Sequence, residues 1–325
     1  MKKTLLLVGI FGMPLRRENS SEGDGTSPVR NKRAKSRQGG VARLFGSWLF
    51  ILSALTGLMT YAFAQNTTLD EAKQFFDRGE FNKAAPIYEK LAAEGDALAQ
   101  YTLAEMYFRG MGVQQDIKKA AALYELAAEK NIMHAQQNIA VLYMQGTGVT
   151  QNFERALFWF RKAAAQGDSF AQYSIGLRYL NGEGVEQNSS EALSWFKKAA
   201  EQGFTQAFWQ IGLLYAQGKG VPRDLKEAAA WTRRAAESGY PPAQRTLGFA
   251  YLYGQGVQRD VVQAYKWLVI SEDMSGGPID LSNPNWEPNM GSFALGVREQ
   301  FKKRISREQI KKGEQEVRNW LATHR

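Results

Sequence analysis

One four-residue phrase, Gly-x-Gly-Val, recurs five times along the chain at a constant spacing of 36 residues. Its copies begin at Gly110, Gly146, Gly182, Gly218 and Gly254. A fixed period of roughly 20–50 residues is the signature of a stacked repeat array. In such an array each unit contacts only its neighbours, and the stack presents one long surface. The spacing therefore predicts a solenoid and favours an interaction protein over an enzyme.

Two helical patterns flank each copy of this phrase. Ahead of it, a small, an aliphatic and a tyrosine residue recur four positions apart, as in Ala99, Leu103 and Tyr107, which places them on one helix face. After it, alanines and a tryptophan recur at offsets of three and seven, again on one face. This spacing predicts that the tryptophans lie in the core: Trp159, Trp195, Trp231 and Trp267.

The ends of the predicted helices carry capping residues. Asn or Asp precedes each second helix, where a side-chain oxygen can accept from first-turn N–H groups: Asp116, Asn152, Asn188, Asp224 and Asp260. The first glycine of each phrase is suited to end the first helix in the left-handed conformation, and the second permits a tight turn. The valine that follows is expected to fill the gap between the two helices. Each unit is therefore predicted to be an αα-hairpin.

The combined pattern of Ala-x-x-x-Leu-Gly-x-x-Tyr-x-x-Gly-x-Gly-Val, a capped helix with Ala-x-x-Trp, and Ala-Ala-x-x-Gly resembles the Sel1-like repeat family, which is related to the tetratricopeptide repeats. Five copies cover residues 96–271, and residues 65–95 fit a plainer tetratricopeptide-like first hairpin. The resemblance implies an all-α fold, a right-handed α-solenoid of αα-hairpin repeats that acts as an adaptor. It is also consistent with export, because bacterial members of the family are often exported and serve in envelope assembly, signalling or contact with a host.

The net charge of +9 is concentrated at the start of the chain. Residues 1–43 hold ten Lys/Arg and three Asp/Glu, and residues 19–40 have hardly any apolar side chains, so this leader is predicted to be mostly disordered. The repeats are close to neutral. Because a surface that follows nucleic-acid phosphates needs a concentration of positive charge, a nucleic-acid partner is not expected.

Residues 44–64 form an uncharged stretch that ends in Ala62-Phe63-Ala64. As a helix it would be about 31 Å long, close to the thickness of a bilayer core. The stretch is either a signal peptide cleaved before Gln65, which the small-x-small pattern favours, or an uncleaved anchor, the only part expected to contact a membrane. Positive charge stays cytoplasmic, so the repeats are expected in the periplasm, or alternatively secreted or held outside the inner membrane.

The C-terminal part, residues 272–325, departs from the repeat. Residues 275–289 are rich in Gly, Pro and Asn and are predicted to form a loop, and residues 292–304 a helix. Ser306-Arg-Glu-Gln309 is a capping box that starts a last helix, whose polar face suits the end of a repeat stack. The sequence therefore predicts C-terminal capping helices.

Residues that carry chemistry are scarce. The chain has no cysteine and two histidines, His134 and His324, and contains no His-Glu-x-x-His motif. A Ser-x-x-Lys match at Ser194 and Lys197 lies inside a repeat helix, where repeat structure accounts for it. We therefore expect no metal, no cofactor and no catalytic activity.

A candidate partner-binding groove follows from the rotation of ~100° per residue in a helix. In related tetratricopeptide superhelices, the face of the first helix opposite its Ala-Leu-Tyr stripe looks into a concave groove. Here that face carries one row of Tyr101, Gln137, Tyr173, Trp209 and Arg245, a second of Glu105, Val141, Leu177, Leu213 and Phe249, and an edge of Arg109, Gln145, Asn181, Gln217 and Tyr253. Aromatic rings there suit a peptide or a helix. Burial between adjacent repeats is the alternative, and is favoured for Val141, Leu177 and Leu213.

These features favour an exported bacterial scaffold that binds another protein through the groove. The alternative is a binder of peptidoglycan or envelope polysaccharide, in which tyrosine and tryptophan rings meet sugar rings. A hydrolase is a third possibility, and the lack of catalytic motifs in the sequence argues against it.

Overall fold

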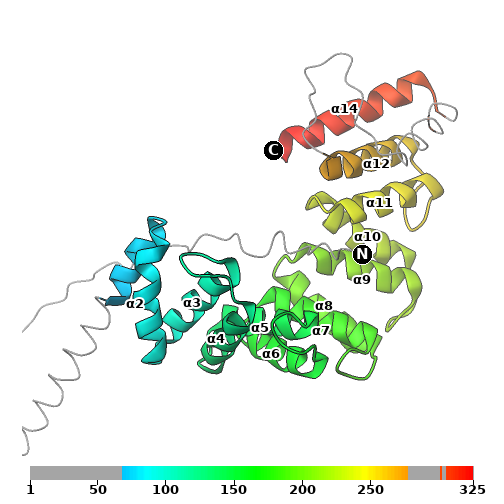
Figure 1. The fold of residues 1–325 in the computed structure, drawn as a ribbon. Helices are drawn as coiled ribbons and strands as arrows, with labels where there is room; N and C mark the ends of the chain where they lie inside the picture. Colours follow the sequence, from blue (N-terminus) through cyan, green and yellow to red (C-terminus); the bar gives the residue numbers. More distant parts are fainter. Residues whose placement is uncertain (1–67, 277–300, 302–304, 325) are drawn as a thin grey trace, which may run out of the picture. The chain divides into compact units, whose positions relative to one another are not determined.

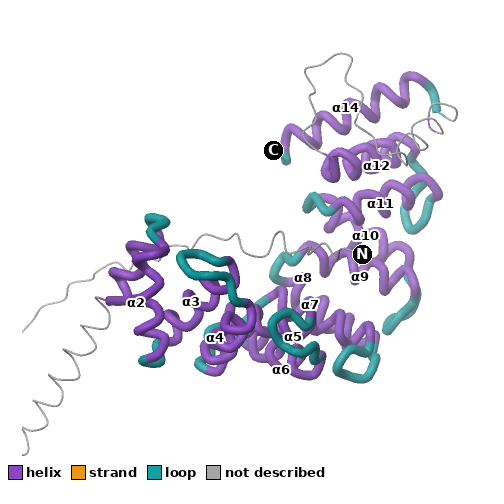
Figure 2. Tube along the Cα trace, viewed as in Figure 1, coloured by secondary structure: helices purple, strands orange, loops and turns teal. Residues whose placement is uncertain are grey.

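The computed structural model describes residues 68–276, 301 and 305–324. Within them every regular element is a helix, and loops join consecutive helices (Figure 2). The basic leader, the uncharged stretch 44–64, most of the predicted loop 275–289 and nearly all of the predicted helix 292–304 lie outside the described residues.

Each of the five repeats contributes two helices, named here helix A and helix B. The A helices are α3 (Ala97–Arg109), α5 (Met133–Gln145), α7 (Ser169–Asn181), α9 (Thr205–Gln217) and α11 (Pro241–Tyr253). The B helices are α4 (Ile117–Glu129), α6 (Phe153–Ala165), α8 (Ser189–Glu201), α10 (Leu225–Glu237) and α12 (Val261–Gly276). Each helix packs against the next along the chain, so the predicted α-solenoid is confirmed (Figure 1).

Additional helices lie at both ends of the repeats. Residues 68–77 are helical and form the predicted first hairpin with α2 (Phe81–Ala93), whose Ala84 and Tyr88 are buried. At the other end α14 (Arg307–Thr323) packs on α12 and begins with the predicted capping box, in which Ser306 and Gln309 each bond the other's backbone N–H. Helix α12 continues through Gly276, two residues into the segment predicted to be a loop.

The predicted caps are present in all five repeats. The side chain of Asp116 accepts from the N–H of Lys119, and the equivalent bond recurs at the start of every other helix B. The first glycine of each phrase ends helix A with φ between +68° and +72°. In addition, the cap's own N–H donates to the carbonyl of the helix A tyrosine, as from Asp116 to Tyr107 at 3.0 Å. These local bonds give every loop the same path.

The second glycine of each phrase lies against the backbone of the preceding repeat. A Cβ on Gly184 would lie 2.5 Å from the carbonyl carbon of Phe153, the first residue of α6. A Cβ on Gly220 would lie 2.4 Å from that of Ser189, the first residue of α8. The same contact recurs at Gly112, Gly148 and Gly256. The predicted turn is confirmed by the positive φ of these glycines, and the structure adds that they join one repeat to the next.

The tryptophan series is buried in two copies and half-buried in two. Trp159 and Trp267 are buried, and Trp320 of α14 covers the ring of Trp267 edge-on at 6.2 Å. Trp195 and Trp231 are only half-buried but pack against the core clusters, so the prediction of core positions is confirmed in part for these two. The Lys198 ammonium lies 4.0 Å from the centre of the Trp195 ring, which keeps one face of that ring at the surface.

Tyrosines of the A helices join successive B helices through their hydroxyl groups. The Tyr107 hydroxyl donates to Glu89 of α2 and accepts from Lys119 of α4. Later in the chain the residue equivalent to Glu89 is an arginine: Arg161 donates to the Tyr179 hydroxyl, and Arg233 donates to the Tyr251 hydroxyl. A hydroxyl can both donate and accept, so the same tyrosine column tolerates either sign of charge.

The role assigned to the second glycine predicts unequal effects of alanine at two left-handed glycines. Gly203, at the end of α8, has no atom within 4 Å of an added Cβ, so Gly203→Ala should lower the free energy of unfolding by about 1–2 kcal/mol through backbone strain alone. Gly184→Ala should cost about 1–3 kcal/mol more, because it also forces apart two repeats. Denaturant unfolding of both variants measures the difference. Equal losses would contradict the contact.

Candidate partner-binding groove

The edge of the helix A face is exposed. Each edge residue is the last residue of its helix A, and all five are exposed: Arg109, Gln145, Asn181, Gln217 and Tyr253. Tyr253 is the most exposed large hydrophobic residue here, at 62%, and its ring stacks on that of Phe249 at 6.3 Å. Arg245, two turns earlier on α11, is exposed as well. The structure thus brings Arg245, Phe249 and Tyr253 together on one helix face.

The large aromatic residues of the first row lie between adjacent repeats. Tyr173 is half-buried, with its ring 5.0 Å from that of Phe204, which precedes α9. Trp209 is half-buried and meets Tyr240 in the same way, at 5.5 Å. Burial also raises the pKa of Tyr173. Tyr101 packs similarly on Tyr124 and His134. Each ring is therefore part of the packing between helices and is also partly exposed, and its role in binding a partner stays a prediction.

The second row is covered to different degrees. Val141 is buried, while Leu177, Leu213 and Phe249 are half-buried. Packing between repeats, expected for the three aliphatic residues, is therefore complete at Val141 and partial at the other two.

Two predicted groove residues, Glu105 and Gln137, are buried, each with 9% of its surface exposed, so their placement at the groove surface is wrong. The Glu105 carboxylate accepts from the Tyr124 hydroxyl at 2.5 Å and from the Asn138 amide at 3.0 Å, and pairs with Arg109 at 3.1 Å. The helical pattern of one repeat predicts which helix face carries Glu105. It does not predict that Glu105 is buried, because Asn138, which bonds it, comes from the next repeat.

The tyrosine hydroxyls near Glu105 stay protonated. Burial, followed by the Glu105 charge, raises the pKa of Tyr124. The same two causes raise the pKa of Tyr101 to about 12. Tyr124 can therefore donate to the carboxylate, which a buried charge requires. Glu105 and Tyr124 are therefore part of the packing between helices.

A buried arginine was missed by the sequence analysis. Arg178 of α7 occupies a helix A position at which other repeats have Met106, Leu142 and Leu214. Burial lowers the pKa of Arg178, while the ion pair with Glu183 at 2.9 Å opposes that shift. Its guanidinium lies 5.7 Å from the centre of the Phe153 ring. The sequence signal for this buried arginine was a single charged residue at a repeat position that is otherwise apolar.

A set of buried glutamines was also missed. Gln100, Gln136 and Gln244 follow the buried alanine in the first turn of helix A and donate to carbonyls near the end of the preceding helix, at 3.0–3.2 Å. Gln166 and Gln202 extend the contacts by donating to Gln136 and Gln172, at 2.7 and 2.8 Å. The recurring Ala-Gln pair was the signal. These side chains bind one repeat to the next.

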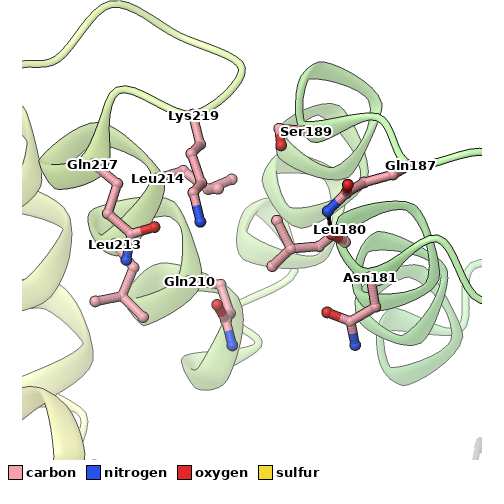
Figure 3. A pocket seen from close by; sticks show the side chains of 9 residues that line it. All are labelled: Leu180, Asn181, Gln187, Ser189, Gln210, Leu213, Leu214, Gln217 and Lys219. Carbon is pink, nitrogen blue, oxygen red and sulfur yellow. Dashed lines mark hydrogen bonds between the residues drawn. The ribbon is translucent and has the colours of Figure 1, made fainter.

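A cavity of about 720 Å³ opens between the third and fourth repeats (Figure 3). Leu180, Leu213 and Leu214 form its apolar part, and Lys219 reaches it from the loop after α9. The remaining lining residues are polar: Asn181, Gln187, Ser189, Gln210 and Gln217. Asn181 and Gln217 belong to the predicted edge, so the structure joins this part of the groove face to a cavity.

Comparison with known proteins places the chain in a family. A family model for the Sel1 repeat matches residues 97–132, 134–168, 169–204, 206–240 and 241–271, which together exceed half of the chain. The chain belongs to the Sel1 repeat family. Sel1 repeat proteins are generally scaffolds that bind other proteins.

The chain is similar to solved structures of Sel1 repeat proteins. A Sel1 repeat protein from Oxalobacter formigenes is 28% identical, with a TM-score of 0.62, and the match covers 79% of this chain and 98% of that one. The protective antigen c5321 of uropathogenic Escherichia coli, which displays an SLR fold, is 30% identical with a TM-score of 0.48, and the match covers 79% of this chain and 61% of that one. No curated protein matches the sequence.

The described residues lack both a metal-binding cluster and a membrane-spanning helix. They contain no group of three or more His, Cys, Asp or Glu side chains placed to hold a metal ion. No helix among them is both long enough and apolar enough to cross a membrane.

Proposed function

We propose that this Sel1 repeat protein is an exported scaffold that binds another protein along the helix A face of its repeats. The proposal is carried by a contrast between two sets of positions. Residues that hold the repeats together recur from copy to copy, as the glycines and the Asn/Asp caps do. The residues at the helix A edge are exposed, and their chemistry varies along the stack from the charged Arg109 to the polar Gln217 to the aromatic Tyr253. Variation there changes the surface offered to a partner and leaves the stacking contacts intact.

The face of α11 is the best anchor for a protein partner. Tyr253 and Phe249 present stacked rings, and Arg245 adds a planar cation on the same face. Aromatic and arginine side chains contribute most to binding energy at protein interfaces. The polar edge toward α7 and α9, with Asn181 and Gln217, offers amide groups that can bond a partner's backbone.

Envelope polysaccharide is the alternative ligand. The observation in its favour is the exposed Tyr253 ring backed by Phe249 at an interplanar angle of 10°, a flat surface on which a sugar ring can stack. The amide groups of the edge would suit sugar hydroxyls equally well. Photocrosslinking to a protein and binding of soluble peptidoglycan fragments distinguish the two ligands.

Export is part of the proposal and is supported by the sequence. The uncharged residues 44–64 precede the repeats and end in Ala62-Phe63-Ala64, the pattern of a signal-peptide cleavage site. With the basic residues 1–43 held in the cytoplasm, the repeats would lie beyond the inner membrane.

A photoreactive amino acid at Gln217 or at Tyr253 should form covalent adducts with a protein in a Gram-negative host. The same amino acid at Phe158, which is 51% exposed on a helix B, is the matched control and should give no adduct of the same mass. Mass spectrometry of the adducts reads the result. Equal adducts from both faces would contradict groove binding. Saturable binding of soluble peptidoglycan fragments that Tyr253→Ala removes, with no protein adduct, would favour the polysaccharide.

Processing gives an independent check on export. The protein recovered from the soluble periplasm should begin at Gln65, because the peptidase cleaves after a small-x-small pattern. N-terminal sequencing of that fraction measures the first residue. Recovery in the membrane pellet with residues 44–64 retained would instead establish an anchor, and recovery in the cytoplasm would overturn export.

A further inference from the structure

The interface between the third and fourth repeats lacks a side chain that the other interfaces have. In α2, α4, α6, α8 and α10, the first residue lies against the second glycine of the next repeat's loop. At that position four interfaces carry a large apolar side chain, from Phe81, Ile117, Phe153 and Leu225, and each is half-buried. The fifth interface has Ser189. The glycine contact is unchanged there, so the backbones meet as elsewhere while the apolar side chain is missing.

The cavity lies at this point. Ser189 lines it, together with Leu180 from the end of α7 and Leu213 and Leu214 from α9 (Figure 3). At the preceding interface, Phe153 takes the place of Ser189 and Arg178 that of Leu214, and these two side chains are in contact. A large side chain at the first helix B position therefore reaches the space that is open beside Ser189. Part of the cavity therefore corresponds to the space that a Leu, Ile or Phe side chain takes at the other interfaces.

The rim of the cavity has the chemistry of a peptide site. Asn181, Gln210 and Gln217 supply carboxamides that can donate to and accept from a backbone. Gln187 is already fixed, since its amide donates to the Leu180 carbonyl at 2.7 Å. Among the residues that line the cavity Lys219 is the only charged one, so the lining carries a single positive charge. The lining therefore combines three leucines, which can contact an apolar side chain, with polar groups that can bond a peptide backbone.

We propose that this cavity is a socket for one large apolar side chain, Leu, Ile or Phe, from an extended segment of a partner protein that carries a carboxylate beside it. The side chain takes the place that Phe153 or Leu225 occupies at other interfaces, and Lys219 pairs with the carboxylate. The socket rests on the proposed function, because it makes a protein segment the ligand. It adds the residue types that the segment must contain.

Short blocked peptides test the socket on the full chain with its leucine methyl groups labelled for NMR. The probes are a Phe-Asp peptide, a Phe-Asn peptide and an Ala-Asp peptide, and a fourth ends in Phe with a free C-terminal carboxylate. The Phe-Asp peptide should shift the methyl signals of Leu213 and Leu214 saturably, at concentrations up to about 10 mM. Ala-Asp should not shift them. Comparing the Asp side chain with the free C-terminus identifies which carboxylate the site prefers.

Variants taken from the chain's own repeats give the decisive comparison. Ser189→Phe and Ser189→Leu fill the cavity with side chains that other interfaces already carry, so melting temperature should not fall. Peptide binding should weaken at least about tenfold. Lys219→Ala should weaken the Phe-Asp peptide about threefold or more and leave Phe-Asn unchanged.

The outcomes separate the socket from the proposed function. Absence of saturable shifts, or equal binding to the Ser189→Phe variant, overturns the socket. If Ser189→Phe removes peptide binding while Gln217 and Tyr253 still form protein adducts, the socket stands as one part of a longer groove. If peptide binding is absent and the adducts persist, the socket is wrong and the scaffold function is retained.

Discussion

The backbone contact between a loop glycine and the start of the preceding helix B is the constraint on which the stack depends. It occurs in all five repeats, at Gly112, Gly148, Gly184, Gly220 and Gly256. A contact between main chains does not depend on the side chains around it, so it gives each repeat the same position on its neighbour. That equality keeps residues 36 positions apart in line along the helix A face. A surface can then vary in chemistry from repeat to repeat without a change in geometry.

Side chains complete each interface in their own way. Glu105 accepts from Tyr124 and Asn138, Arg178 forms an ion pair with Glu183, and a column of glutamines donates to helix ends across repeats. The charges that meet the helix A tyrosines reverse along the chain, from Glu89 to Arg161. At Ser189 an apolar side chain is left out, and a cavity lies beside it. Function is therefore best sought where an interface is incomplete.

Local features were predictable from the sequence, and contacts between repeats were not. Caps such as Asp116 and left-handed glycines such as Gly110 depend on residues a few positions away, so their spacing reveals them. The covering of Glu105, by contrast, comes from a residue 33 positions later, and half-exposure of Trp195 depends on what the neighbouring helices leave open. Aligning the five copies would have exposed two of the exceptions, Arg178 in an apolar column and Ser189 in a bulky one.

Native-state hydrogen exchange tests most directly whether the repeats share one backbone geometry while their interfaces are packed to different degrees. The buried apolar residues fall into two clusters, one from Ala72 to Ile175 and one from Ala192 to Leu321, and the cavity lies beside their junction. Helices of equal length with the same loop bonds should therefore open unequally. Amides of α8 and α9 next to the cavity should exchange through openings of lower free energy than those of α4 and α5. Equal protection in both regions would contradict the account.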